Sequence, residues 1–228
     1  MALARSGLRT ALAFWLVAAT TYSGGALAEP LRYLALGDSY TIGQGISPKG
    51  RWPVQLTAAL RKNGFEFESP PIIARTGWTG EQLIEAIGQA NPPAHFDLVS
   101  LLIGVNNQFR GHSLEAFREQ FDELLTTSIR LAKGRKDRVF VVSIPDYGYT
   151  PFGKRGRVGI GKAIDVYNAA CAEIAAWHGV VFIDITGVSR SRPDDWSWTA
   201  SDTLHPSSAQ YAGWVDVMLT RVSTLLEK

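Results

Sequence analysis

Three residues near the two ends of this chain have the types and spacing of a nucleophilic catalytic group. The sequence GDS places Ser39 directly after the apolar run 31–36, at the end of an expected buried strand. Asp202 and His205 are three residues apart, so the carboxylate can reach the imidazole, fix its tautomer and stabilise its protonated form. Such an imidazole can remove the proton of a serine hydroxyl, which then attacks a carbonyl carbon.

Each of these residues also has a simpler interpretation. A serine after Gly-Asp commonly caps the next helix, and Asp-x-x-His is more often a helix cap than a catalytic pair. Pro206 suits the first turn of a helix that follows His205. The catalytic interpretation therefore depends on Ser39, Asp202 and His205 meeting in space.

Two further stretches could supply donors for a developing oxyanion. Gly80, in RTGWTGEQL, lies where a helix is expected to begin, so backbone N–H groups there have no intrahelical partner. Asn106, in GVNN, has a side-chain amide that can donate. We expect these two residues to join the Ser39 N–H in an oxyanion hole, although both stretches could also be plain turns.

The elements that would position these residues alternate along the chain. Helical patterns occupy residues 112–133, 162–178 and the segment after Pro206. Runs rich in branched and aromatic residues predict five strands, at residues 31–36, 71–74, 98–103, 138–144 and 180–185.

Strands that are apolar from end to end, each followed by a helix, predict one three-layer α/β/α domain with a five-stranded parallel sheet. In the flavodoxin-like strand order 2-1-3-4-5, the ligand crevice lies between the first and third strands, at their carboxyl ends. Ser39 ends the first strand and Asn106 follows the third, so both would face this crevice.

Residues 1–28 have the pattern of a secretory signal peptide. Two arginines precede an apolar run at residues 11–19, and the small-x-small sequence ALA ends at Ala28. The run is shorter than the ~18 residues that span a bilayer, although an uncleaved anchor is the alternative. We expect cleavage near Ala28, export to the periplasm or the medium, and a mature domain at residues 29–228 without stable membrane insertion.

The charge balance argues against nucleic acid as a partner, and the single cysteine argues against an internal disulfide. The chain has 23 Lys and Arg and 21 Asp and Glu, and the leader holds two of the basic residues, so residues 29–228 carry 21 of each. A neutral domain without clusters of Lys and Arg lacks the basic surface that nucleic acid binding needs. The single cysteine, Cys171, shares a helical face with apolar residues, which predicts a small buried hydrophobe and no internal disulfide.

The motifs resemble, in order, the four blocks of the SGNH, or GDSL-type, hydrolases: GDSY at residues 37–40, the glycine of TGE at residue 80, GVNN at residues 104–107 and DTLH at residues 202–205. The resemblance covers nearly all of residues 29–228. It implies a flavodoxin-like fold and ester hydrolysis without a metal or organic cofactor.

By this resemblance Ser39 is the nucleophile and Asp202 and His205 complete the triad, while Gly80 and Asn106 donate to the oxyanion with the Ser39 N–H. The chain departs from the family pattern at Arg75, where an asparagine is common, and at Asn107, where an aspartate is common. These departures leave the shape of the oxyanion loops open.

We therefore expect an exported serine esterase that cleaves carboxylic esters of short to medium acyl chains through an acyl-enzyme. Its partner would be a small-molecule, lipid or glycan ester. The alternatives are a deacetylase of extracellular glycans and a non-catalytic lipid- or carbohydrate-binding protein on the same fold. Nucleotide binding is disfavoured because GDSYTIGQG matches neither glycine-rich phosphate motif, and the four histidines lack paired metal-ligand spacing.

Two features could shape a substrate pocket. Loop 144–159 would either form one wall, with Arg155 and Arg157 near an acidic group of the substrate, or be a solvated surface loop, which is the commoner outcome. Four tryptophans fall beside the expected crevice and could bind acyl chains or sugar rings, or simply pack in the core. They are Trp52, Trp78, Trp196 and Trp198.

Overall fold

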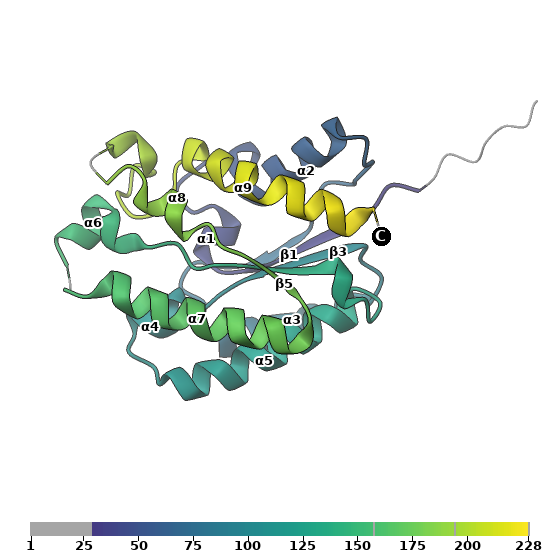
Figure 1. Ribbon diagram of the computed structural model, residues 1–228, viewed down its shortest axis with the longest axis horizontal. Helices are drawn as coiled ribbons and strands as arrows, with labels where there is room; N and C mark the ends of the chain where they lie inside the picture. Colours follow the sequence, from purple (N-terminus) through teal and green to yellow (C-terminus); the bar gives the residue numbers. More distant parts are fainter. Residues whose placement is uncertain (1–28, 157, 194, 228) are drawn as a thin grey trace, which may run out of the picture.

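The computed structural model describes residues 29–156, 158–193 and 195–227. The predicted signal peptide at residues 1–28 and the predicted pocket residue Arg157 lie outside the described residues. Five strands form one parallel sheet in the order β2-β1-β3-β4-β5, which confirms the predicted topology (Figure 1). The strands are β1 (Tyr33–Gly37), β2 (Ile72–Ala74), β3 (Leu98–Leu102), β4 (Val139–Val142) and β5 (Val181–Ile183).

Helices cover both faces of this sheet and make the three predicted layers. In Figure 1, α2 (Trp52–Lys62) and α9 (Ser208–Leu226) lie on one face. The other face carries α3 (Gly80–Ala90), α5 (Leu114–Leu131) and α7 (Ile160–His178). Single 3-10 turns occur at Pro48–Gly50, Lys136–Arg138, Tyr147–Tyr149 and Trp196–Trp198.

The core is continuous through the sheet because both faces of its central strands are covered. Every residue of β1, β3 and β4 is buried. The largest side chains of the core come from the sheet and from both helical layers. They include Tyr33, Trp52, Phe117, Phe121, Phe140, Tyr211 and Trp214. Cys171 is buried on α7 as predicted, and burial raises the pKa of its thiol.

Four short helices at the carboxyl ends of the strands were not expected from the sequence. They are α1 (Ser39–Ile42), α4 (Val105–Phe109), α6 (Pro151–Lys154) and α8 (Thr186–Arg190). A segment of four or five residues is too short to show helical periodicity, whereas the long helices lie within two residues of their predicted bounds where these were given. In Figure 1 these short helices gather at one end of the sheet.

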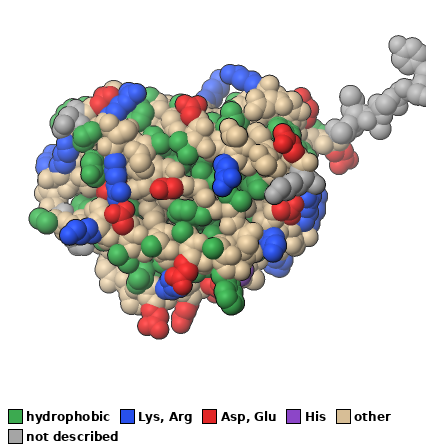
Figure 2. Space-filling view, in the orientation of Figure 1, with side chains coloured by type: hydrophobic (Ala, Val, Ile, Leu, Met, Phe, Trp, Pro, Cys, Tyr) green, Lys and Arg blue, Asp and Glu red, His purple; other side chains and the backbone are tan. Residues whose placement is uncertain are grey.

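Basic and acidic side chains are interspersed over the face shown in Figure 2. No single-sign cluster dominates that face, in keeping with the balanced charge of residues 29–228. Within the described ranges, no helix has the length and apolar character needed to cross a bilayer.

Candidate active site

Ser39 begins α1 at the carboxyl end of β1. Asp38 caps this short helix, because its Oδ1 accepts a hydrogen bond from the Tyr40 N–H at 3.0 Å. Burial raises the pKa of the Asp38 carboxyl to about 7, although the Tyr40 N–H acts in the opposite direction. Ser39 is only 4% exposed, and it lines a pocket at this edge of the sheet.

Asp202 and His205 form the predicted pair. The Nδ1 atom of His205 lies 2.7 Å from Oδ2 of Asp202. The other carboxylate oxygen, Oδ1, accepts hydrogen bonds from the N–H groups of Leu204 at 3.0 Å and His205 at 2.9 Å. Three short contacts within four residues fix both side chains relative to the backbone.

Electrostatics favour the ionised form of Asp202. Partial burial would raise the pKa of this carboxyl, but the N–H groups of His205 and Leu204 and the His205 ring together hold it below its ordinary value. An ionised carboxylate only accepts hydrogen bonds, so Nδ1 of a neutral His205 carries the hydrogen and Nε2 keeps its lone pair. The ring of Tyr40 packs against the imidazole, with 5.5 Å between ring centroids.

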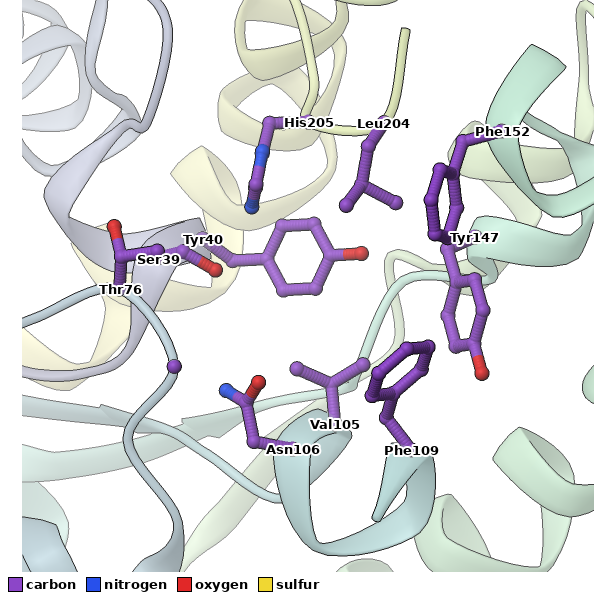
Figure 3. A pocket seen from close by; sticks show the side chains of 11 residues that line it. Ser39, Tyr40, Thr76, Val105, Asn106, Phe109, Tyr147, Phe152, Leu204 and His205 are labelled. Carbon is purple, nitrogen blue, oxygen red and sulfur yellow. The ribbon is translucent and has the colours of Figure 1, made fainter. Parts of the chain in front are cut away.

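The structure brings Ser39 and His205 to one pocket of about 150 Å³. Figure 3 shows the two side chains entering this pocket from neighbouring segments, with Asn106 opposite His205. No direct hydrogen bond joins the Ser39 hydroxyl to the His205 ring among the described residues. Such bonds are often long in proteins without substrate and shorten when substrate binds.

Asn106 and Gly77 lie beside Ser39 on the polar side of the pocket. Gly104, at a φ of 124°, turns the chain out of β3 into α4, which carries Asn106. The Asn106 Nδ2 donates one hydrogen to the Trp78 carbonyl at 2.9 Å, which leaves its second hydrogen for a ligand. Gly77 has a φ of 85°, and its N–H donates to no other group of the described residues.

Gly80 makes a contact that the sequence did not predict. Its N–H donates to the buried Oδ1 of Asn107 at 2.9 Å. Thr79 caps α3, so Gly80 is the first helical residue. Gly77, three residues earlier in the loop, lines the pocket.

The opposite side of the pocket is apolar. Figure 3 shows Phe109, Tyr147 and Phe152 together on this side, away from Asn106. Leu204, next to His205, and Val105, next to Asn106, complete the apolar wall. Tyr147 and Phe152 belong to loop 144–159, so this loop does form a wall of the pocket. Phe109 was not predicted as a pocket residue, because nothing local in the sequence distinguishes it from a core residue.

None of the four candidate tryptophans lines this pocket. Trp52 is fully buried in the core. Trp198 is also buried, and Cζ of the Arg192 guanidinium lies over its ring, 4.2 Å from the ring centroid. Trp78 packs partly against the core, while Trp196 is 66% exposed. Arg155 lies beside Trp196 in a separate surface hollow, where its Nη2 donates to the Thr203 hydroxyl at 3.2 Å. Across the described ranges, no three His, Cys, Asp or Glu side chains group as metal ligands would.

A family model described as the GDSL-like lipase/acylhydrolase family matches residues 35–212. No curated protein matches the chain.

Solved structures with a similar fold include TesA, at 17% identity and a TM-score of 0.65, covering 86% of this chain and 99% of that one. A lipase/acylhydrolase from Enterococcus faecalis has 20% identity and a TM-score of 0.65, covering 85% and 96%. The acetylxylan esterase Axe2 from Geobacillus stearothermophilus has 18% identity and a TM-score of 0.62, covering 84% and 94%. Likeness at these identities establishes the fold.

Proposed function

Because the chain belongs to the GDSL-like lipase/acylhydrolase family, we propose that it is a serine esterase that cleaves carboxylic esters through an acyl-enzyme on Ser39. The observation that carries this proposal is one pocket lined by Ser39, His205 and Asn106, with Asp202 bonded to the far side of the imidazole. These residues come from distant parts of the chain, and together they supply a nucleophile, a base and an oxyanion donor.

In the first half of the reaction, the Ser39 Oγ attacks the ester carbonyl carbon and its proton passes to Nε2 of His205. Asp202 accepts the hydrogen bond from Nδ1–H throughout and stabilises the imidazolium. The carbonyl oxygen becomes an oxyanion as the new C–O bond forms. When the tetrahedral intermediate collapses, the ester C–O bond breaks and His205 returns the proton to the leaving alcohol.

In the second half, a water molecule attacks the acyl carbon while His205 takes one of its protons. The acyl–Oγ bond breaks, the proton returns to Ser39, and the carboxylic acid leaves. His205 therefore acts as base and then acid in each half. Both roles need the same Nε2 atom facing the pocket, which the contact between Nδ1 and Asp202 favours.

We propose an oxyanion hole formed by the N–H of Ser39, the Nδ2–H of Asn106 and the N–H of Gly80, the last as the family resemblance assigns it. In this structure the Gly80 N–H donates to Oδ1 of Asn107, the residue next to Asn106. Donors fixed before the reaction stabilise the developing charge without reorganisation, and each is worth ~3 kcal/mol in comparable sites.

The apolar wall supports acyl groups longer than acetyl. Phe109 and Phe152 flank the pocket and keep 42% and 40% of their surface exposed, which an acyl chain would cover. We propose short to medium acyl chains as substrates. We further propose that residues 1–28 are removed near Ala28 on export. The mass of the mature protein from a periplasmic or medium fraction tests this, and a chain still carrying residue 1 would contradict it.

A panel of p-nitrophenyl esters from acetate to decanoate, together with acetylated xylan, tests the function in wild type and Ser39→Ala. We expect hydrolysis with a maximum above acetate, and a loss of about 10⁴-fold or more in kcat/KM for Ser39→Ala. A fluorophosphonate should label wild type and not the variant. Activity confined to acetylated xylan would favour a deacetylase, while an unlabelled and inactive wild type would indicate a binding protein.

A further inference from the structure

Tyr40 brings a phenol hydroxyl into the pocket, and no step of the proposed ester cleavage uses it. The side chain is 3% exposed and lines the pocket together with Ser39 and His205. In Figure 3 the ring crosses the pocket from α1, so the hydroxyl points away from Ser39 and Asn106 and toward the apolar wall. This hydroxyl makes no hydrogen bond within the part of the chain that the structure describes, because the bonds of Tyr40 use its backbone.

The surroundings of this hydroxyl are otherwise apolar. The second phenol of the pocket, on Tyr147, already donates to Oε1 of Gln108 at 2.9 Å. The Tyr147 ring packs edge-on against Phe109, with 6.1 Å between ring centroids, and Phe152 lies on the same side. A ligand that enters between these rings therefore meets one unused hydrogen-bond donor, the hydroxyl of Tyr40.

The position of the hydroxyl is fixed relative to the nucleophile, because Tyr40 is the next residue along α1. Its N–H donates to Asp38 at 3.0 Å, and its carbonyl accepts from the Tyr211 hydroxyl at 2.9 Å. Its ring lies against the rings of His205 and Trp214, at centroid distances of 5.5 and 6.4 Å. A donor that cannot shift meets one position along an acyl chain attached to the nucleophile.

The chemistry of the hydroxyl favours an oxygen atom at that position. Burial raises the pKa of Tyr40 well above its ordinary value, so the phenol keeps a hydrogen to donate. A bound acyl chain takes the hydroxyl out of contact with water. An all-carbon chain then leaves the donor unpaired, which costs more free energy than an ordinary hydrogen bond gains, whereas an oxygen in the chain accepts the hydrogen.

We propose that the Tyr40 hydroxyl is a specificity determinant that donates a hydrogen bond to an oxygen atom within the acyl chain. The preferred substrates are then esters of oxygen-bearing acids, such as hydroxy, oxo or alkoxy acids. This inference rests on the proposed esterase function and narrows its acyl group. Tyrosine stands in GDSY where the family name GDSL has leucine, which carries no donor.

The test uses pairs of p-nitrophenyl esters in which an ether oxygen replaces one methylene. The pairs are methoxyacetate with butyrate, 3-methoxypropanoate with pentanoate, and 4-methoxybutanoate with hexanoate. For each pair, the ratio of kcat/KM for the ether ester to that for the alkyl ester is divided by the same ratio in Tyr40→Phe. The intrinsic reactivity of the esters cancels in this double ratio. Phenylalanine keeps the ring that lies against His205 and Trp214.

We expect a double ratio of about tenfold or more for one pair and near one for the other two, because the fixed hydroxyl meets one chain position. In the favoured pair, Tyr40→Phe should lower kcat/KM for the ether ester and raise it for the alkyl ester, which no longer covers an unpaired donor. Tyr149→Phe is the matched control. Its ring is 41% exposed outside the pocket, so its double ratios should stay near one.

An active wild type with double ratios near one for all three pairs would overturn this inference alone. An equal loss for every ester in Tyr40→Phe, with a lowered thermal midpoint, would show that the hydroxyl supports the fold and would also overturn it. A Tyr40-dependent preference for acetylated xylan over p-nitrophenyl acetate, without an effect of the ether oxygen, would place the donor at the alcohol and overturn the acyl assignment. A wild type that neither hydrolyses esters nor reacts with a fluorophosphonate would overturn the proposed function first.

Discussion

The two sides of the pocket are built in opposite ways. On the polar side, hydrogen bonds at Gly77, Trp78 and Gly80 join the loop 76–80 to α4 and to the residue that follows it, and Asn107 is fully buried. On the apolar side, Phe109 and Phe152 expose about two fifths of their surface. Phe152 also sits on α6, a helix of only four residues.

The difference follows from the forces that each side uses. A hydrogen bond to an oxyanion weakens steeply when its direction is wrong, so its donors must be fixed before the reaction. Contact with an acyl chain depends mainly on apolar area, which is not directional. Under the proposed function, a fixed polar side and an open apolar side would allow one chemistry with acyl chains of different length.

Among substitutions on the polar side, Asp202→Asn should lower kcat the most. The new amide keeps an oxygen for the Leu204 and His205 N–H groups, but its NH₂ favours the wrong tautomer of His205. We expect kcat to fall about 10⁴-fold with little change in KM. Steady-state kinetics with p-nitrophenyl butyrate measure this, and Asp195→Asn, on an exposed neighbouring turn, is the control.

The pH dependence of stability checks the same variant. The pKa of Asp202 is lowered on folding, so its ionised form stabilises the fold above its ordinary pKa, and this contribution is lost as the pH falls through the folded-state value. On acidification from about pH 5 to about pH 3, wild type should lose more unfolding free energy than Asp202→Asn. Parallel curves for the two proteins would contradict this assignment.

Removing one donor should have a smaller effect. Asn106→Ala deletes an amide that lines the pocket, and we expect kcat to fall about a hundredfold or more. Asn107→Ala is the informative comparison. The buried Asn107 amide bonds to Gly80 and Gln120, so its removal should lower the thermal midpoint as well as kcat. If Asn106→Ala retained full kcat, the amide would not contact the oxyanion.

Substitutions on the apolar side should have the smallest effect, and they should change how kcat/KM depends on the length of the acyl chain. Phe152→Ala removes part of the wall, so we expect kcat/KM to fall about fivefold for octanoate and less than twofold for acetate, since a buried methylene is worth ~0.8 kcal/mol. Trp196→Ala removes an exposed ring outside the pocket and should leave both values unchanged. An equal loss for both esters would place the acyl chain elsewhere.

Much of the fold and part of the site could be predicted because they depend on local patterns. Apolar runs and amphipathic stripes identified the strands and the long helices, and Asp202 and His205 meet because three residues of one turn separate them. Ser39 was recognisable because a strand that ends in GDS delivers it to a sheet edge whose position follows from the strand order.

The remaining parts of the site were decided by tertiary packing. The sequence contains Gly77 and Gly80 three residues apart, and only the folded structure shows that Gly77 lines the pocket while the Gly80 N–H donates to Asn107. Phe109 and Phe152 form one wall although 43 positions separate them in the numbering. The direction of a backbone N–H and the lining of a pocket depend on partners distant in sequence, which no local pattern records.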